Sequence, residues 1–369
     1  MKTLAKARIL VTRFPFESRF GGEEVHTLSL MEGLRERGFE VFFLGACPVL
    51  SDEFAKRDFE TQYVWLGKPP VNFAWLIFFT LMSPPLFFWA GILLWRAKKK
   101  WSVDTLYCLS LGEKLLMTPW ARIFKMKVLW LEHARIGNWL TRNPWRVFYS
   151  ILSRWAKVVV TSNAMLRFLP FVKNIQAINC GVFLEKEWAL PTEVEKFLED
   201  GKGSLRLLFV ARLTADKGVD IMDRIVHSQP DIKLIVVGEG PFKFRENPRL
   251  KVLSNLKRGQ LTTLYKSVDL LVLPSTEFDP FGMVAAEAMT AGTPCLISDK
   301  CGISFDLKNE REAIIRKPTF KEFDLTLKKL KRNPELLKKV ARAGENFAKK
   351  NYTLTRMVDE FDYLLSPVD

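Results

Sequence analysis

Strand-like and helix-like segments alternate along the chain in two separate series, and this alternation restricts the possible folds. In the first series, extended runs at Ile9–Val11 and Glu40–Leu44 flank a helical pattern from Leu28 to Leu34. The second series starts at Leu205 and repeats strand and helix as far as Ala291. Such alternation is typical of parallel sheets that carry helices on both faces. The sequence therefore predicts an α/β protein with two Rossmann-like, doubly wound domains facing a central cleft.

The length of 369 residues fits two domains, each with its own core. We place an acceptor-side domain at 1–184, a polar linker at 185–204 and a donor-binding domain at 205–345. A charged helical pattern from Pro334 to Leu365 breaks near Asn351–Thr353. Its last part, 346–369, is expected to pack back on the first domain.

The chain is basic, with 56 Lys and Arg against 41 Asp and Glu and a net charge of +15. Such a charge favours phosphates or an anionic membrane surface as partners. Nucleic acid is disfavoured, because the sequence has no zinc-finger spacing, no aromatic RNA-binding signature and no long basic arm. Five cysteines without metal-ligand spacing, and a first apolar run too short for a signal peptide, predict a cytoplasmic protein.

An uncharged apolar segment at 71–95 allows three interpretations. A membrane-spanning helix is disfavoured, because Ser83–Pro85 would break it in the middle. A buried helix pair is the second interpretation. We favour the third, an interfacial helical hairpin that inserts aromatic side chains into the membrane and places lysines at the headgroups. The predicted membrane contacts are Trp75, Phe78, Phe79, Phe87, Phe88, Trp89, Lys98, Lys99 and Lys100.

Two segments have the chemistry of phosphate binding. Gly21 and Gly22 lie between a strand and a helix, where backbone N–H groups can approach a phosphate, although a plain turn explains the pair equally well. Arg212 and Lys217 follow the strand Leu205–Val210, at the sheet edge where open α/β proteins bind ligands. Together the two cations could hold a diphosphate, whereas either alone would be an ordinary surface charge.

The segment from Asp279 to Glu287 strengthens the second assignment. Pro280 and Gly282 shape a loop that leads into a helix, so the N–H groups of Gly282, Met283 and Val284 should be free for sugar or phosphate oxygens. The two carboxylates are eight positions apart, which predicts that both lie along one helix face. Glu287 stands in an apolar run, where a carboxylate needs a partner.

These motifs resemble the retaining glycosyltransferases of family four, the glycosyl transferases group 1, which have the two-domain GT-B fold. The resemblance covers most of the chain and is strongest in its second half. The residues that carry it are Gly21–Gly22, Ser162–Ala164, Gly181–Val182, Ala211–Arg212, Lys217–Gly218, Gly238–Pro241 and Pro274 to Pro294.

The resemblance implies a role for each matching residue. Arg212 and Lys217 would hold the donor diphosphate, Asp279 the sugar and Glu287 the ribose. His133, which follows the strand-like run Val128–Leu131, matches a histidine near the donor sugar, although a structural histidine fits the same place. Further implied donor contacts are Gly21, Gly22, Gly238, Phe281, Gly282, Met283 and Val284.

Two positions depart from the family pattern. The first acid of the pair is usually Glu, whereas this chain has Asp279, and Glu277 is close enough to share or take over its role. The segment Asn179–Phe183 also differs from the loop that the family has before its second domain.

These observations predict a peripheral membrane glycosyltransferase that transfers a sugar from a nucleotide-sugar donor to a lipid-linked or glycolipid acceptor. No Asp-x-Asp motif occurs, so we expect neither a metal nor another cofactor to be required. The resemblance implies a front-face substitution in which the donor phosphate takes the acceptor proton. The alternatives are a soluble sugar-phosphate or glucan synthase of the same fold and a non-catalytic membrane-associated sugar-nucleotide-binding protein.

Overall fold

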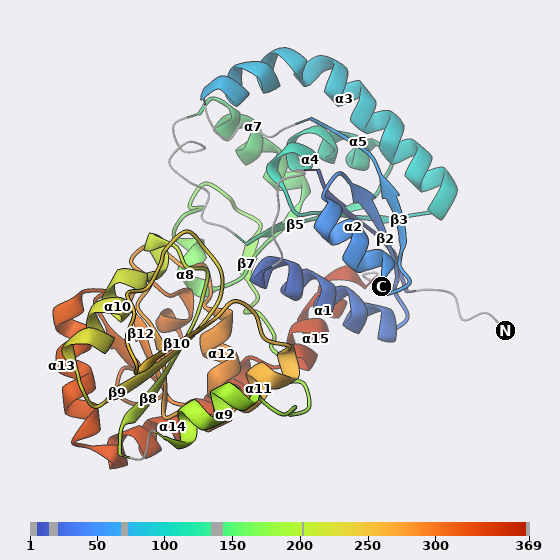
Figure 1. Ribbon diagram of the computed structural model, residues 1–369. Coiled ribbons are helices and arrows are strands. Elements are labelled where there is room, and N and C mark those ends of the chain that lie inside the picture. The colour runs from blue at the N-terminus through green and yellow to red at the C-terminus, as the bar shows by residue number, and fades with distance from the viewer. Residues whose placement is uncertain (1–5, 15–20, 68–72, 134–142, 201–202, 367–369) are drawn as a thin grey trace. The chain divides into compact units, whose positions relative to one another are not determined.

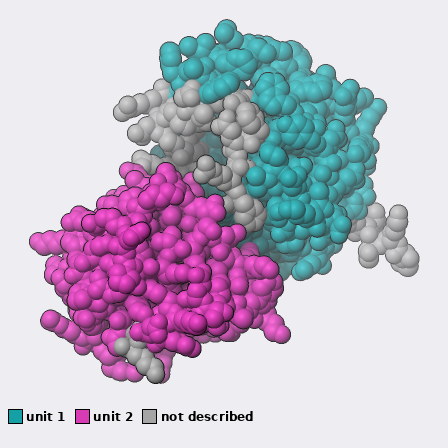
Figure 2. Space-filling model, viewed as in Figure 1, with its two compact units in different colours: residues 1–179, 354–369 teal, residues 180–353 magenta. Residues whose placement is uncertain are grey.

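The computed structural model describes residues 6–14, 21–67, 73–133, 143–200 and 203–366, and it divides into two compact units (Figure 2). Unit 1 comprises Met1–Asn179 together with Leu354–Asp369, and unit 2 comprises Cys180–Thr353. The chain therefore passes from one unit to the other twice. Each unit is a parallel sheet with helices on its faces (Figure 1), which confirms the predicted α/β class.

Unit 1 contains a seven-stranded parallel sheet of order β3-β2-β1-β4-β5-β6-β7. The strands that occupy its centre are almost completely buried, as expected for a sheet covered on both faces. The strands are β1 (Arg8–Arg13), β2 (Glu40–Gly45), β3 (Glu60–Tyr63), β4 (Thr105–Cys108), β5 (Lys127–Glu132), β6 (Lys157–Val160) and β7 (Ile175–Ala177).

Helices from both ends of the chain cover the unit 1 sheet. The C-terminal helix α15 packs along α1 (Figure 1), and a Cβ at Gly33 would lie 2.5 Å from Val358 Cγ2, so the glycine permits this close approach. The helices are α1 (Gly22–Glu36), α2 (Pro48–Ala55), α3 (Phe73–Trp101), α4 (Leu111–Leu116), α5 (Thr118–Ile123), α7 (Trp145–Leu152), α8 (Asn163–Leu166) and α15 (Leu354–Leu365), with a 3-10 turn η1 (Ser153–Trp155).

Unit 2 contains a six-stranded parallel sheet of order β10-β9-β8-β11-β12-β13. Its strands are β8 (Leu205–Val210), β9 (Ile232–Val237), β10 (Leu250–Leu253), β11 (Leu270–Leu273), β12 (Cys295–Ser298) and β13 (Ile314–Arg316). Its helices are α9 (Thr192–Glu199), α10 (Val219–Ser228), α11 (Arg258–Ser267), α12 (Met283–Thr290), α13 (Phe320–Lys331) and α14 (Pro334–Asn351), with 3-10 turns η2 (Ala215–Lys217) and η3 (Gly302–Phe305).

Strand order reverses once in each sheet, and these reversals mark where a ligand can enter. In unit 1 the reversal lies between β1 and β4, and in unit 2 it lies between β8 and β11. Loops that leave the two strands at such a point run in opposite directions and leave an opening at their carboxyl ends. The functional residues should therefore follow β1, β4, β8 and β11.

The segment 185–204, which the sequence suggests as a linker, is part of unit 2. It contains helix α9, and Leu190 and Val194 are buried in the unit 2 core. The chain instead enters unit 2 at Cys180 and leaves it after Thr353. The predicted break near Asn351–Thr353 is present, because α14 ends at Asn351 and α15 begins at Leu354.

The predicted hairpin at 71–95 is wrong, because α3 is a single helix from Phe73 to Trp101 that passes through Pro84 and Pro85. Pro84 lacks the N–H group that would bond to the Thr80 carbonyl. The Ser83 hydroxyl donates to that carbonyl instead, at 2.9 Å, and so satisfies the oxygen that the proline leaves free. The buried helix pair is excluded by the same observation.

Candidate active site

The loops after β8 and β11 are joined to each other at the strand-order reversal of unit 2. The N–H of Thr276 donates to the Asp216 carbonyl at 2.9 Å. Gly218 has φ +73°, and a Cβ there would lie 2.2 Å from the carbonyl oxygen of Pro274. Only glycine tolerates both this backbone conformation and this close approach. The Lys217 side chain is thereby fixed beside the residues that follow β11.

Lys217 and Asp279 form an ion pair at this place, with 2.7 Å between Nζ and Oδ2. Both side chains are largely buried, at 16% exposure each. The Asp279 backbone is fixed by two hydrogen bonds, since its N–H donates to the Lys300 carbonyl and its own carbonyl accepts from the Gly302 N–H at 2.7 Å. The pair joins two segments that are 62 positions apart in sequence.

Asp279 and Glu287 do not share a helix face, so that expectation is wrong. Asp279 precedes α12, which begins only at Met283. Glu287 lies within α12, where its Oε2 accepts from the Tyr265 hydroxyl at 2.8 Å and its Oε1 lies 3.7 Å from Arg258. Burial raises the pKa of Glu287, while Arg258 and Tyr265 act in the opposite direction.

Tyr265 and Arg258 were not singled out from the sequence. Both belong to α11 and are seven positions apart, which puts them on one helix face. The spacing predicts that Tyr265 and Arg258 share a helix face, but the neighbouring sequence does not show that this face contacts Glu287. The structure thus adds Tyr265 and Arg258 to the site, as the partners of the predicted carboxylate Glu287.

The start of α12 offers backbone donors. Gly282 precedes the helix with φ +96°, and no side chain caps the helix among the described residues. The N–H groups of Met283 and Val284 therefore lack intrahelical acceptors, as at any first helical turn, and favour an anion. The Phe281 side chain is buried against Tyr352 with ring centroids 5.4 Å apart, so the donor contact expected of it can involve only its backbone.

Arg212 and Glu277 lie on the same two loops as Lys217 and Asp279, and Gly238 lies on the loop after β9. The Arg212 and Glu277 side chains are exposed, and neither has a side-chain partner within the residues that the structure describes. Gly238 has φ +148°, and a Cβ there would lie 1.9 Å from the Ala211 carbonyl oxygen. Glycine at 238 thus lets the loop after β9 run against the loop that carries Arg212.

Unit 1 has its own polar cluster at the strand-order reversal of its sheet. Arg13, the last residue of β1, contacts Glu23 and Glu24, each at 3.0 Å. The His26 and His133 rings meet edge to face, 4.7 Å apart. Burial lowers the pKa of both histidines well below the ordinary value, so both are neutral at physiological pH. Gly21 precedes α1 and Gly22 opens it, with the Gly21 carbonyl accepting from the Val25 N–H.

A buried lysine completes the unit 1 cluster. Lys114 Nζ lies 2.7 Å from Glu132 Oε1 and donates to the Leu131 carbonyl at 2.6 Å. The Tyr149 hydroxyl donates to the same Glu132 oxygen at 2.7 Å. These residues could not be selected from the sequence, because a lysine and a glutamate 18 positions apart form no local pattern.

Glu113 precedes Lys114 in sequence, and its buried carboxyl group should make the free energy of unfolding depend on pH. It is fully buried, and burial raises its pKa from 4.5 to about 7. Because the folded-state pKa exceeds the unfolded value, the folded protein holds this proton more tightly. The free energy of unfolding should therefore fall by on the order of 3 kcal/mol as the pH rises from 4.5 through 7.

Glu113→Gln should remove this slope and leave the variant progressively more stable than the wild type between pH 5 and pH 8. The amide oxygen can still accept the Ser110 N–H, which donates to Glu113 Oε1 at 2.6 Å. Thermal unfolding at several pH values measures the effect, with Glu246→Gln at an exposed position as the control. Parallel curves for wild type and Glu113→Gln would contradict the prediction.

Two Rossmann-like parallel sheets in one chain are the architecture of the GT-B fold. Residues 20–186 match the model described as Glycosyltransferase Family 4, and residues 192–347 match Glycosyl transferases group 1. The chain belongs to this glycosyltransferase family, which confirms the resemblance seen in its motifs.

Relatives and solved structures agree with this assignment. An uncharacterized glycosyltransferase of Methanocaldococcus jannaschii is 36% identical over 29% of this chain and 30% of its own. Mannosylfructose-phosphate synthase of Agrobacterium fabrum is 26% identical over 45% of this chain and 40% of its own. The matches thus span less than half of either relative. Anabaena HepE, solved with UDP and glucose, has a TM-score of 0.76 at 16% identity and covers 98% of this chain and 100% of its own.

Proposed function

We propose that the protein transfers a sugar, with retention of anomeric configuration, from a UDP-sugar donor. The observation that carries the proposal is the Lys217–Asp279 ion pair, held at the strand-order reversal of unit 2 beside the start of α12. A cation, a carboxylate and free helix amides in one place suit a diphosphate with an attached sugar. The complex of Anabaena HepE with UDP-glucose, on the same fold, supports a uridine donor.

In this mechanism the positive charge at the unit 2 site stabilises the departing diphosphate. Arg212, Lys217 and the first N–H groups of α12 face the negative charge that develops as the bond between sugar and phosphate breaks. The donor phosphate takes the acceptor proton, so no protein base is assigned. Glu287 is proposed to hold the ribose, and its hydrogen bond from Tyr265 fixes the carboxylate for that contact. His133 remains a predicted contact of the sugar.

The ion pair itself suggests how binding and positioning are connected. When the diphosphate arrives, Lys217 gains a second anionic partner and releases part of its hold on Asp279. The Asp279 carboxylate can then accept hydrogen bonds from sugar hydroxyls. Glu277, which is exposed and lies two residues before Asp279 in the same loop, is proposed as a secondary contact.

The donor is tested by a thermal-shift series with UDP, UDP-glucose and GDP-mannose, followed by assay of free sugar released by slow hydrolysis. UDP-glucose should raise the unfolding temperature, because a ligand that binds only the folded state stabilises it by mass action. Release of glucose separates a transferase from a protein that merely binds. If no nucleotide sugar shifted the transition or was hydrolysed, the proposed activity would be excluded.

A membrane-borne acceptor is proposed from the outer face of α3. By length and composition α3 could cross a membrane, but its inner face packs on the rest of unit 1. The Trp120 indole N–H, for example, donates to the Phe87 carbonyl at 2.8 Å. The outer face carries large apolar side chains at helical spacing, and an exposed apolar surface of this kind marks an interaction site. These side chains are Phe73, Ile77, Leu81, Phe88, Ile92 and Trp95.

Several of the predicted membrane contacts do not lie on that face. Phe79 is buried against Trp145, so it cannot contact lipid. Lys98 donates to the Phe124 carbonyl, and Lys100 pairs with Glu60 at 2.8 Å. Phe78 and Phe88 are exposed, whereas Trp75, Phe87 and Trp89 are half-buried. The proposed lipid contact is therefore one continuous helix face rather than the tip of a hairpin.

We expect the double substitution Leu81→Gln and Phe88→Gln to lower co-sedimentation with phosphatidylcholine vesicles severalfold, because these side chains are 73% and 63% exposed and would lose their transfer into the lipid interface. Leu325→Gln with Phe305→Gln, at exposed positions of unit 2, is the matched control. Equal recovery of the α3 variant and the wild type would speak against a lipid-linked or glycolipid acceptor on the cytoplasmic membrane face. It would favour a soluble sugar-phosphate acceptor, as the similarity to mannosylfructose-phosphate synthase also suggests.

A further inference from the structure

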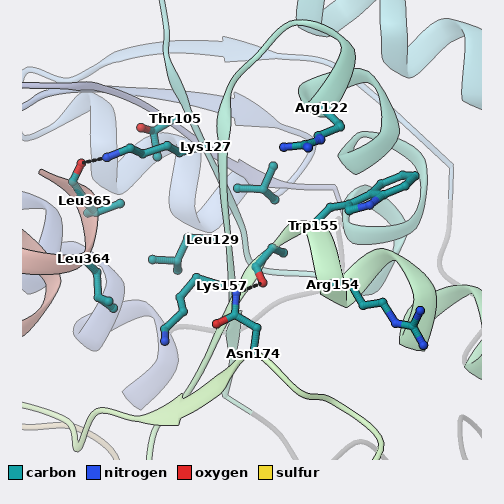
Figure 3. A pocket seen from close by; sticks show the side chains of 12 residues that line it. Thr105, Arg122, Lys127, Leu129, Arg154, Trp155, Lys157, Asn174, Leu364 and Leu365 are labelled. Carbon is teal, nitrogen blue, oxygen red and sulfur yellow. Dashed lines mark hydrogen bonds between the residues drawn. The ribbon is translucent and has the colours of Figure 1, made fainter. Parts of the chain in front are cut away.

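A pocket of about 280 Å³ opens at the amino edge of the unit 1 sheet, opposite the edge where His133 follows β5 (Figure 3). Lys127 and Lys157 are the first residues of β5 and β6 and line its wall. Arg122 comes from α5, and Arg154 comes from the turn η1. On the same measure one water molecule needs roughly 10–15 Å³, so the pocket has room for a group of the size of a phosphate.

The charged residues that line this pocket are all basic. Arg122, Lys127, Arg154 and Lys157 line it without a carboxylate among the lining residues that the structure describes. Lys127 donates to the carbonyl oxygens of α15 at Leu365 and just beyond, and these carbonyls do not neutralise its charge.

Among the described residues, the acid Asp104 is adjacent in sequence to a lining residue and already has hydrogen-bond partners. Asp104 precedes Thr105, which lines the pocket, and its carboxylate accepts from the Thr105 hydroxyl at 2.7 Å and from the Arg8 N–H at 3.1 Å. Figure 3 shows that Arg154 and Lys157 extend in different directions and that Lys127 points to the Leu365 carbonyl, so the four charges are spread around the pocket and do not meet at one point. Their shared sign still makes this surface favourable for an anion, and the planar fork of an arginine fits phosphate oxygens.

An exposed apolar stripe leads to this pocket. Val147, Ile151 and Trp155 follow each other at a spacing of four residues and are 60%, 44% and 45% exposed. Trp155 also lines the pocket. The same helix α7 contacts α3, because the Trp145 indole N–H donates to the Thr80 hydroxyl at 3.0 Å. Apolar side chains and a cationic pocket thus lie on neighbouring parts of unit 1.

We propose that this pocket binds the phosphate of an anionic phospholipid headgroup while Ile151 and Trp155 enter the lipid interface. The inference rests on the membrane association proposed above and adds a defined headgroup site to it. A tryptophan at the rim of a basic pocket suits the boundary between headgroups and acyl chains. A freely soluble phosphate would use the same cations but would leave the apolar stripe without a role.

The test compares Arg154→Glu with Lys157→Glu, as a double variant, against Lys339→Glu with Lys350→Glu on the exposed side of α14. Both changes alter the charge by the same amount. The wild type should bind vesicles containing phosphatidylglycerol more tightly than vesicles of phosphatidylcholine alone. The pocket variant should lose at least tenfold of that preference, since it reverses two positive charges that attract an anionic surface. The α14 variant should keep it, and UDP-glucose hydrolysis in solution should be the same in all three proteins.

The failures of the two proposals can be told apart. If the pocket variant kept the preference for phosphatidylglycerol while the α3 variant lost vesicle binding, the headgroup site would be overturned and the membrane association would stand. If the wild type bound no vesicles, both would fall. Titration with glycerol phosphate covers the remaining source, because saturable binding that depends on Arg154 and Lys157, without vesicle binding, would assign the pocket to a soluble phosphate and overturn the lipid assignment.

Discussion

Lys217→Ala should lower the turnover number for UDP-glucose by on the order of a hundredfold to a thousandfold, the usual effect of removing one group that stabilises charge in a transition state. Lys217 is held by the η2 turn and by its ion pair with Asp279, so it is already positioned before the donor binds. Lys339→Ala, at an exposed site on α14, is the matched control and should leave turnover unchanged. The measurement is release of glucose from UDP-glucose under saturating conditions.

Asp279→Asn tests the ion pair while it leaves the Lys217 side chain in place. The asparagine keeps a hydrogen-bond acceptor for Lys217 Nζ but removes the ion pair. If Lys217 acts on the diphosphate, this variant should lose less turnover than Lys217→Ala and should raise KM for the sugar donor. Wild-type turnover in Lys217→Ala would remove the proposed role of the lysine, whatever the behaviour of Asp279→Asn.

Arg212 differs from Lys217 because it is exposed and has no side-chain partner in the described part of the chain. Its loss should therefore leave the free energy of unfolding within about 0.5 kcal/mol of the wild type, as for most surface substitutions. If the loss of Arg212 lowered turnover and left the free energy of unfolding unchanged, its role would be in binding the donor and not in stabilising the fold.

Much of the fold could be predicted because a buried strand of a parallel sheet is a short, continuous apolar run in the sequence. The run Leu205–Val210, for example, is a strand with the predicted bounds. The position of Arg212 and Lys217 after such a strand, at the carboxyl edge where parallel sheets bind ligands, could be predicted in the same way, while their contact with the donor stays a prediction. Local pattern and tertiary position agree at these residues.

The sequence failed where a tertiary contact decides the outcome. Proline at 84 suggested a helix break, but one serine hydroxyl and the packing of the inner face of α3 preserve the helix. The polar segment before residue 205 looked like a linker, yet Val194 is fully buried in the unit 2 core. Asp279 and Glu287 fit a helical spacing, although α12 begins between them. In each case the structure depends on contacts in the folded protein that the neighbouring sequence does not show.

The buried pair Lys114–Glu132 shows the same limit and leads to the largest expected change in stability. Lys114 is 1% exposed, and its charge is balanced by one carboxylate that also accepts from Tyr149. Lys114→Met removes the cation and leaves Glu132 charged in an apolar interior. Breaking a buried pair in this way costs about 3–5 kcal/mol, because the remaining charge keeps its desolvation cost without compensation.

Urea unfolding of three variants measures this cost and identifies its source. Lys56→Met removes a lysine from an exposed pair with Glu53, so it should change the free energy of unfolding by no more than about 1 kcal/mol. Lys114→Met combined with Glu132→Gln removes both buried charges and should recover a large part of the loss, since the amide oxygen can still accept from Tyr149. If the double variant were no more stable than Lys114→Met, the loss would come from packing of the lysine stem, and the electrostatic explanation would be wrong.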